Sequence, residues 1–326
     1  MNLRNFLTKA AVLLLTLVIF YSCANKKNEQ VAEVESNTEV NSGPFFEISL
    51  AQWSLHKAYF DGSLDPMDFA KQSKELGINA VEYVSQLYVG KMKPEDKATE
   101  IPKIAAELKK RSETQGVTNV LIMVDREGDL ASSDAKKRKE AIKNHTLWVD
   151  AAATLGCTSI RVNLAPTRGL SDEEWHKNSV LGLGALADIA AKKNINVIVE
   201  NHGGISSDGA KLAAVMAEIN KPNCGTLPDF GNFCIDGSPR GDCKVEYDRY
   251  KGTKELMPYA KGVSAKSYDF DAEGNETKMD YKKLLQIVKD ADYTGFIGVE
   301  YEGDRLSEKE GIIATKELLL KLRSEF

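Results

Sequence analysis

The chain has 326 residues, a length that suits one large domain or two average ones. Hydrophobic residues make up 42% and charged residues 28%, a composition typical of globular proteins. It carries 43 Lys and Arg residues against 48 Asp and Glu residues, for a formal net charge of −5. This acidic balance argues against a nucleic-acid-binding protein, which needs a basic surface to neutralise phosphates.

The first 22 residues differ from the rest of the chain. Arg4 and Lys9 precede the apolar run AAVLLLTLVIF, and Ser22 and Cys23 follow it. A basic start, a short apolar run and a small residue are typical of an export signal, and the run is short for a membrane span. The position of Cys23 resembles the lipobox of bacterial lipoproteins, which implies lipidation there. A plain signal peptide or a membrane anchor is the alternative.

The sequence therefore predicts an exported protein of the cell envelope or periplasm, lipid-anchored at Cys23. Residues 24–43 are polar and lack aromatic residues, which favours a flexible tether. We expect a signal peptide at 1–22, a tether at 23–44 and one folded domain at 45–326. Removal of the signal peptide would change the net charge to −7.

From residue 45 onward, apolar runs alternate with helical patterns. The apolar runs predict strands at 47–55, 79–86, 118–125, 159–166, 196–203, 225–232, 262–270 and 296–303. Their nearly continuous apolar starts are expected for parallel strands covered on both faces. Helical patterns with start and stop signals lie at 65–77, 133–156, 171–194, 208–220, 280–293 and 307–326.

Eight strands that alternate with helices predict an α/β fold of the (β/α)8 TIM barrel type, and the length of the domain agrees with it. A doubly wound open sheet is the alternative. That fold would want a glycine-rich phosphate turn after the first strand. The residues at that position are HKAYFDG, which weakens the alternative.

Four cysteines lie in the predicted domain. Cys234 and Cys243 flank the turn-rich stretch IDGSPRGD, and the sequence leaves open whether they form a disulfide. Cys157 and Cys224 each precede a predicted strand and are expected to be buried thiols. No CxxC spacing is present, which argues against a thiolate zinc site.

Polar residues concentrate at the carboxyl ends of the predicted strands, where the catalytic groups of TIM barrels lie. They are His56, Glu82, Asp125, Asn163, Glu200, His202, Asp229, Asn232, Ser264, Lys266, Glu300 and Glu302. Clustered carboxylates repel one another unless a cation or shared protons compensate. Glu200, Asp229 and Glu300 therefore predict a site for a divalent metal ion. Pairing of these acids with Lys266 or Arg161 is the alternative interpretation.

The stretches VIVENHGG, TLPDFGNF, GVSAKSYDF and IGVEYEG carry a family resemblance. With them, residues 45–326 resemble the xylose-isomerase-like barrel superfamily, in particular its sugar phosphate isomerase/epimerase group. The resemblance implies that Glu200, Asp229 and Glu300 hold one divalent ion, manganese, zinc or magnesium. Two positions depart from the family pattern: Ser264 stands where the family has a histidine ligand, and Asn232 where it often has a substrate-binding histidine. The presence of the ion and the identity of the sugar therefore stay open.

The reaction implied by the resemblance is proton transfer next to a carbonyl, with Glu200 and Glu300 as the acid–base pair. Lys266 could stabilise an enediolate by its charge or form a salt bridge instead. The predicted substrate-binding residues are Trp53, His56, Glu82, Asn163, His202 and Asn232. His145 and His176 lie in helical patterns, and we expect both at the surface.

The predicted function is a metal-dependent sugar isomerase or epimerase, with a free sugar, keto-sugar or glycoside as its small-molecule partner. A sugar phosphate is disfavoured by the export signal and by the absence of a phosphate-binding glycine turn. A lyase or hydratase on an oxidised sugar would use the same proton removal. A non-catalytic sugar-binding lipoprotein is the alternative favoured by Ser264. An apurinic endonuclease would need a histidine-rich cluster of several metals, and the chain has only four histidines.

Overall fold

The computed structural model describes residues 44–164, 169–238 and 241–326. The predicted signal peptide, the lipidation site Cys23 and all but the last residue of the predicted tether lie outside these ranges. Within the described ranges, no helix combines the length and the apolar character needed to cross a membrane.

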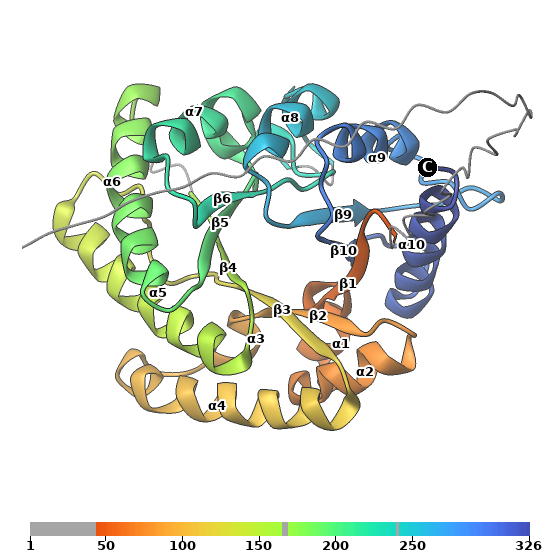
Figure 1. The fold of residues 1–326 in the computed structure, drawn as a ribbon, viewed down its shortest axis with the longest axis horizontal. Helices are drawn as coiled ribbons and strands as arrows, with labels where there is room; N and C mark the ends of the chain where they lie inside the picture. The colour runs from red at the N-terminus through yellow and green to blue at the C-terminus, as the bar shows by residue number, and fades with distance from the viewer. Residues whose placement is uncertain (1–43, 165–168, 239–240) are drawn as a thin grey trace, which may run out of the picture. The chain divides into compact units, whose positions relative to one another are not determined.

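Eight parallel strands form one curled sheet with helices around it (Figure 1). The strands are β1 (Glu47–Ala51), β2 (Ala80–Val84), β3 (Thr118–Met123), β4 (Ser159–Val162), β5 (Asn196–Glu200), β6 (Cys224–Leu227), β9 (Val263–Ser267) and β10 (Phe296–Tyr301). Their order in the sheet is β6-β5-β4-β3-β2-β1-β10-β9. Isolated parallel bridges from Thr226 to Ala260 and from Asp229 to Ser264 bring the two edge strands together. The predicted (β/α)8 barrel is confirmed.

The helices lie outside the ring of strands (Figure 1). They are α1 (His56–Asp61), α2 (Phe69–Glu75), α3 (Gln86–Val89), α4 (Pro94–Gln115), α5 (Ala135–Leu155), α6 (Asp172–Ala191), α7 (Gly209–Ile219), α8 (Arg249–Leu256), α9 (Tyr281–Asp290) and α10 (Glu308–Arg323). The six predicted helical patterns correspond to α2, α5, α6, α7, α9 and α10. The helix α4 lies in the crossover after β2, and α8 lies in the crossover after β6. Neither helix was predicted from the sequence.

Local sequence signals explain where several helices begin. The hydroxyl of Ser171 accepts the N–H of Glu174, whose carboxylate accepts the N–H of Ser171, so a capping box starts α6. Ser307 and Glu310 start α10 in the same way. The side chain of Asp134 accepts the first free N–H groups of α5. These caps determine the residue at which each of the three helices begins.

The alternation of side chains along the strands decides which residues face the barrel interior. In β5, Val197 and Val199 belong to the core between strands and helices, whereas Ile198 belongs to the cluster inside the barrel. Glu200 is two residues after Ile198 and therefore points inward as well. The same alternation directs Ser264 and Lys266 of β9 inward, because Val263 and Ala265 belong to the outer core.

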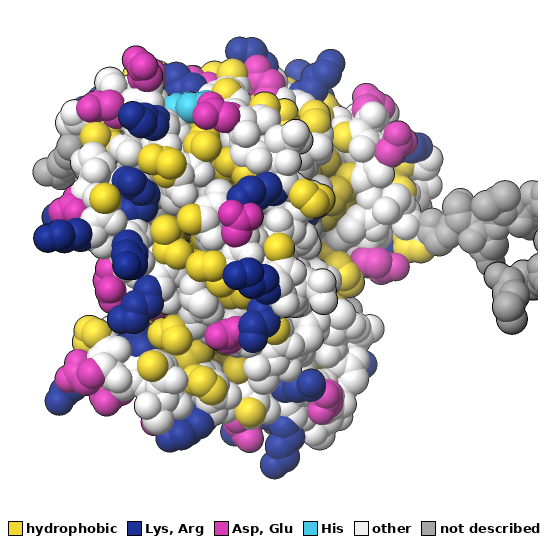
Figure 2. Space-filling view, turned by 60° about the vertical axis from the view of Figure 1, so that its left-hand side comes forward, with side chains coloured by type: hydrophobic (Ala, Val, Ile, Leu, Met, Phe, Trp, Pro, Cys, Tyr) yellow, Lys and Arg dark blue, Asp and Glu magenta, His cyan; other side chains and the backbone are white. Residues whose placement is uncertain are grey.

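The outer surface of the barrel is polar where the helices face solvent. Figure 2 shows one flank, on which basic and acidic side chains both occur among apolar and neutral ones. This mixture is expected for amphipathic helices whose apolar faces pack on the strands.

A short antiparallel hairpin follows β6. It consists of β7 (Cys234–Asp236) and β8 (Val245–Glu246), and a disulfide joins Cys234 to Cys243. The question that the sequence left open is thereby answered in favour of the bridge. Cys157 and Cys224 are buried free thiols, as predicted.

Candidate active site

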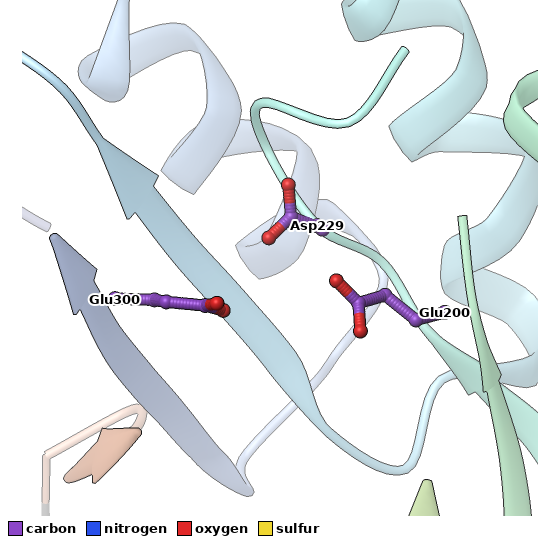
Figure 3. A group of neighbouring side chains, drawn as sticks. All are labelled: Glu200, Asp229 and Glu300. Carbon is purple, nitrogen blue, oxygen red and sulfur yellow. The ribbon is translucent and has the colours of Figure 1, made fainter. Parts of the chain in front are cut away.

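Three carboxylates meet at the carboxyl end of the barrel. Glu200 ends β5, Asp229 lies two residues after β6, and Glu300 lies near the end of β10. Figure 3 shows the three side chains pointing toward a common centre. One oxygen of each lies within 4.8 Å of the others, and the residues are only 1%, 0% and 4% exposed. The structure thus brings together the three acids that the sequence predicts as metal ligands.

Asp229 is held in place by backbone and side-chain contacts. Its Oδ1 accepts the N–H groups of Gly231 and Asn232, both at 2.8 Å. The side chain of Asn201 donates to the carbonyl oxygen of Asp229 at 3.0 Å and accepts its N–H at 2.8 Å. Asn201 directly follows Glu200 in the ENHG stretch but was not among the predicted site residues.

Ser264 lies between two of the acids. Its Oγ is 2.6 Å from Oδ2 of Asp229 and 2.9 Å from Oε2 of Glu300. A hydroxyl has only one hydrogen, so it can donate to only one of these oxygens. The second contact needs a proton on a carboxylate or a cation close by. A proton or a cation near Ser264 is therefore needed to stabilise the close approach of Asp229 and Glu300 to its hydroxyl.

Arg161 of β4 provides the first positive charge. Its Nε lies 2.9 Å from Oε2 of Glu200, and one terminal nitrogen lies 2.7 Å from Oδ1 of Asp125. The amide of Asn163 also donates to that Asp125 oxygen, at 2.8 Å. Asn232 donates to the other oxygen of Glu200 at 2.9 Å. Both oxygens of Glu200 thus contact donors, one from β4 and one from the segment that follows β6.

Lys266 provides the second positive charge. Its Nζ lies 3.0 Å from Oε1 of Glu300, 3.7 Å from Oδ2 of Asp229 and 3.6 Å from Oε1 of Glu302. Lys266 is only 2% exposed. Salt bridges to Lys266 and Arg161, the alternative interpretation of the sequence, are therefore present together with the clustering of the acids.

The two cations do not neutralise the acids around them. Arg161 and Lys266 face five carboxylates, those of Asp125, Glu200, Asp229, Glu300 and Glu302. Burial raises the pKa of Glu200 to about 7, against the opposing effect of Arg161. Burial likewise raises the pKa of Asp229 to about 7, against the effect of Lys266. Near neutral pH the cluster therefore shares protons or attracts a further cation.

The donor atoms fit a divalent cation. Carboxylate oxygens of Glu200, Asp229 and Glu300 and the hydroxyl of Ser264 surround one buried point, and all four donors are oxygens. Hard cations such as Mg²⁺ and Mn²⁺ prefer oxygen ligands, whereas Zn²⁺ is usually bound with nitrogen or sulfur. The residues therefore suit a hard divalent ion.

Glu82 lies inside the barrel, beneath this cluster. Its Oε1 accepts a hydrogen bond from Ser49 at 2.6 Å, and its Oε2 is buried with no hydrogen-bond partner in the described residues. A Cβ at Gly298, two residues before Glu300, would lie 2.7 Å from both oxygens of Glu82. Burial and the charges of nearby glutamates raise the pKa of Glu82 to about 8. The structure thus places Glu82 below the mouth rather than on its wall.

A cavity of about 460 Å³ opens above the carboxylates. Lys266 and Glu300 line it, and so do four predicted substrate-binding residues, Trp53, Asn163, His202 and Asn232. Three further lining residues, Gln86, Arg126 and Ser238, were missed because they follow the strands by a few residues and lie on loops or at helix starts. Loop side chains of this kind have no periodic signal in the sequence.

The remaining histidines lie elsewhere. His56 does not line the cavity: its ring stacks on Trp53 with centroids 4.7 Å apart, and its Nδ1 contacts the Trp53 carbonyl oxygen at 2.7 Å. His176 lies on α6 and pairs with Glu218, in agreement with the prediction. The expected surface position of His145 is wrong, because this residue is on the inner face of α5 and is only 2% exposed.

Comparisons with known proteins agree with the barrel fold. The profile of the family described as xylose isomerase-like TIM barrel matches residues 70–322. No protein of curated function matches the chain. Among solved structures, 3-keto-D-glucoside 4-epimerase YcjR of E. coli is 15% identical with a TM-score of 0.60, covering 80% of this chain and 94% of that one.

Two further structures are similar. D-psicose 3-epimerase, solved in the presence of D-fructose, is 13% identical with a TM-score of 0.63, covering 85% of this chain and 99% of that one. The IolI protein, solved with a zinc atom, is 16% identical with a TM-score of 0.65, covering 86% of this chain and 99% of that one. At these identities the likeness shows a shared fold.

Proposed function

The chain belongs to the xylose isomerase-like TIM barrel family, and on that premise we propose that it is a sugar isomerase or epimerase that uses one divalent cation. The observation that carries this proposal is the meeting of three buried carboxylates, Glu200, Asp229 and Glu300, below an open cavity. The epimerase names of two similar structures support it. The three carboxylates and Ser264 would hold the ion.

Glu200 and Glu300 are the proposed acid–base pair. They come from β5 and β10, on opposite sides of the cluster, so one could remove a proton next to the carbonyl and the other return one. The raised pKa of Glu200, about 7, suits a group that both accepts and donates protons at neutral pH. A bound divalent cation would supply Lewis-acid polarisation of the carbonyl.

Lys266 positions Glu300 and carries a positive charge into the cavity wall. A charge at this place would stabilise an enediolate as it forms. Trp53, Asn163, His202 and Asn232 are the proposed substrate-binding residues of the wall. The proposed substrate is a free sugar, keto-sugar or glycoside without phosphate.

The proposed location is the cell envelope. Residues 1–22 would direct export, and lipidation of Cys23 would attach the protein to a membrane. The polar stretch of residues 24–43 would then hold the barrel away from the membrane surface. Metabolic labelling with a fatty acid tests this part of the proposal, and a Cys23→Ser variant should lose the label.

Exchange of solvent deuterium into a panel of keto-sugars tests the reaction. We expect deuterium at a carbon next to the carbonyl, and we expect Glu300→Gln to slow the exchange by about 100-fold or more, because the variant cannot accept the proton. Glu317→Gln, an exposed change on α10, is the matched control. Wild-type exchange in Glu300→Gln would contradict the assigned role.

The ion pairs favour one second candidate. Glu200 and Glu300 both contact buried cations, an arrangement that also suits a sugar-binding lipoprotein without catalysis. Sugar binding with no exchange in any member of the panel would favour this candidate. Exchange accompanied by loss of water would instead indicate a lyase or hydratase.

A further inference from the structure

A second, smaller cavity adjoins the mouth of the barrel beside β3 and α5. Its volume is about 250 Å³, and it shares Arg126 and Asn163 with the cavity above the carboxylates. Asp129 and His145 belong to the rest of its wall. Because two residues line both cavities, the two cavities are adjacent. We call the smaller space the side cavity.

His145 presents a hydrogen-bond acceptor to the side cavity. Its Nδ1 lies 2.7 Å from the carbonyl oxygen of Ala141. A carbonyl oxygen only accepts, so Nδ1 carries the hydrogen of the neutral ring and Nε2 carries the lone pair. Burial lowers the pKa of His145, which favours this neutral form. Among the described residues, nothing donates to Nε2, which is therefore available to a hydroxyl group of a ligand.

Arg126 lines both cavities. Its φ of 62° is in the left-handed region, which is uncommon for residues other than glycine. Backbone strain of this kind is often retained at functional sites. The side chain is exposed, and it forms no ion pair within the described residues, unlike Arg161 in the same wall. Its guanidinium can therefore donate to a ligand in either cavity.

We propose that the side cavity binds a second sugar ring, so that the substrate is a disaccharide or a related glycoside. This inference rests on the proposed function, since the reacting ring is taken to lie over Glu200 and Glu300. The donors of Arg126 and the acceptor of His145 are complementary to sugar hydroxyl groups, which both accept and donate hydrogen bonds.

Calorimetric titration of the full chain with glucose, cellobiose, maltose, sucrose and trehalose tests the proposal. We expect at least one disaccharide to bind ten-fold or more tightly than glucose. Two variants should reduce the ratio of disaccharide affinity to glucose affinity at least five-fold. His145→Asn keeps an N–H for the Ala141 carbonyl but has no acceptor atom at the position of Nε2. Arg126→Gly removes the guanidinium and suits the left-handed backbone, so it does not threaten folding.

Matched controls lie outside both cavities. His176→Asn makes the same exchange on the exposed side of α6, and Asp292→Gly relieves another left-handed residue, with φ of 53°. Both should leave the ratio unchanged. Equal affinity for glucose and all four disaccharides, or an unchanged ratio in both test variants, would overturn the side-cavity proposal. Disaccharide preference without proton exchange would support it while overturning the proposed isomerase or epimerase activity.

Discussion

At the scale of single residues, Ser264 has the largest consequence for the candidate site. Its hydroxyl occupies the place between Asp229 and Glu300 and makes the donor set entirely oxygen. An imidazole there would add a nitrogen ligand, which zinc prefers. We expect Ser264→His to bind Zn²⁺ at least ten-fold more tightly than the wild type, measured by competition with a coloured zinc indicator.

The control for this prediction is Ser324→His, which adds a histidine at an exposed position after α10. It should leave the zinc affinity of the cluster unchanged. Equal zinc affinity in Ser264→His and the wild type would show that Ser264 does not border the ion site.

Glu82 carries a prediction about pH. Its pKa is about 8 in the folded protein and 4.5 as the ordinary value, so the folded state holds the proton more tightly. Proton binding to Glu82 therefore adds to the free energy of unfolding. This contribution is complete below pH 4.5 and is lost as the pH rises through 8. Glu82→Gln keeps the shape without the charge. Between pH 4.5 and 8, the free energy of unfolding of Glu82→Gln relative to the wild type should therefore rise by about 1.4 kcal/mol per pH unit.

Chemical denaturation at pH 5.5 and 7.5, about two pH units apart and both inside this window, measures the difference. The exposed variant Glu317→Gln should show no such trend. A constant difference between Glu82→Gln and the wild type would mean that Glu82 is ionised in the folded protein throughout.

At the scale of elements, the β7–β8 hairpin holds Ser238 at the cavity mouth. The disulfide from Cys234 to Cys243 closes this segment with a sequence separation of 9 residues. Loop-closure entropy predicts that Cys234→Ser/Cys243→Ser lowers the free energy of unfolding by about 2–3 kcal/mol. A reductant should bring the wild type to the same melting temperature and leave the double variant unaffected. A melting temperature that is insensitive to reductant in both would contradict this contribution.

Most elements of the barrel could be predicted because their signals are local. Apolar runs mark the strands, and Ser171, Asp134 and Ser307 mark helix starts. Two helices, α4 and α8, were not predicted, although Pro94 and Asp248 mark their starts. The helix α4 is predominantly polar and contains Pro102, and α8 is short and has few apolar residues. Both helices form because the barrel needs a crossover after β2 and β6, which is a tertiary requirement.

At the scale of the whole molecule, the acid cluster predicts that a divalent cation stabilises the barrel. A ligand that binds only the folded state at 100 times its dissociation constant adds about 2.7 kcal/mol. We expect Mn²⁺ to raise the melting temperature by roughly 5–10 °C and a chelator to reverse the shift. Asp229→Asn, which removes one ligand charge, should lose most of the shift. An equal shift in the variant would place the ion elsewhere.

The sequence by itself determined the alternation of strands and helices, and with it the barrel and the end of the barrel at which Glu200, Asp229 and Glu300 lie. These features follow from periodicity and caps, which depend on neighbours in the chain. The closed sheet alone decided that Ser264 lies between two acids, that Glu82 lies below the mouth, and that His145 faces a cavity. Such contacts join residues far apart in the sequence, so strand register and barrel closure set their distances.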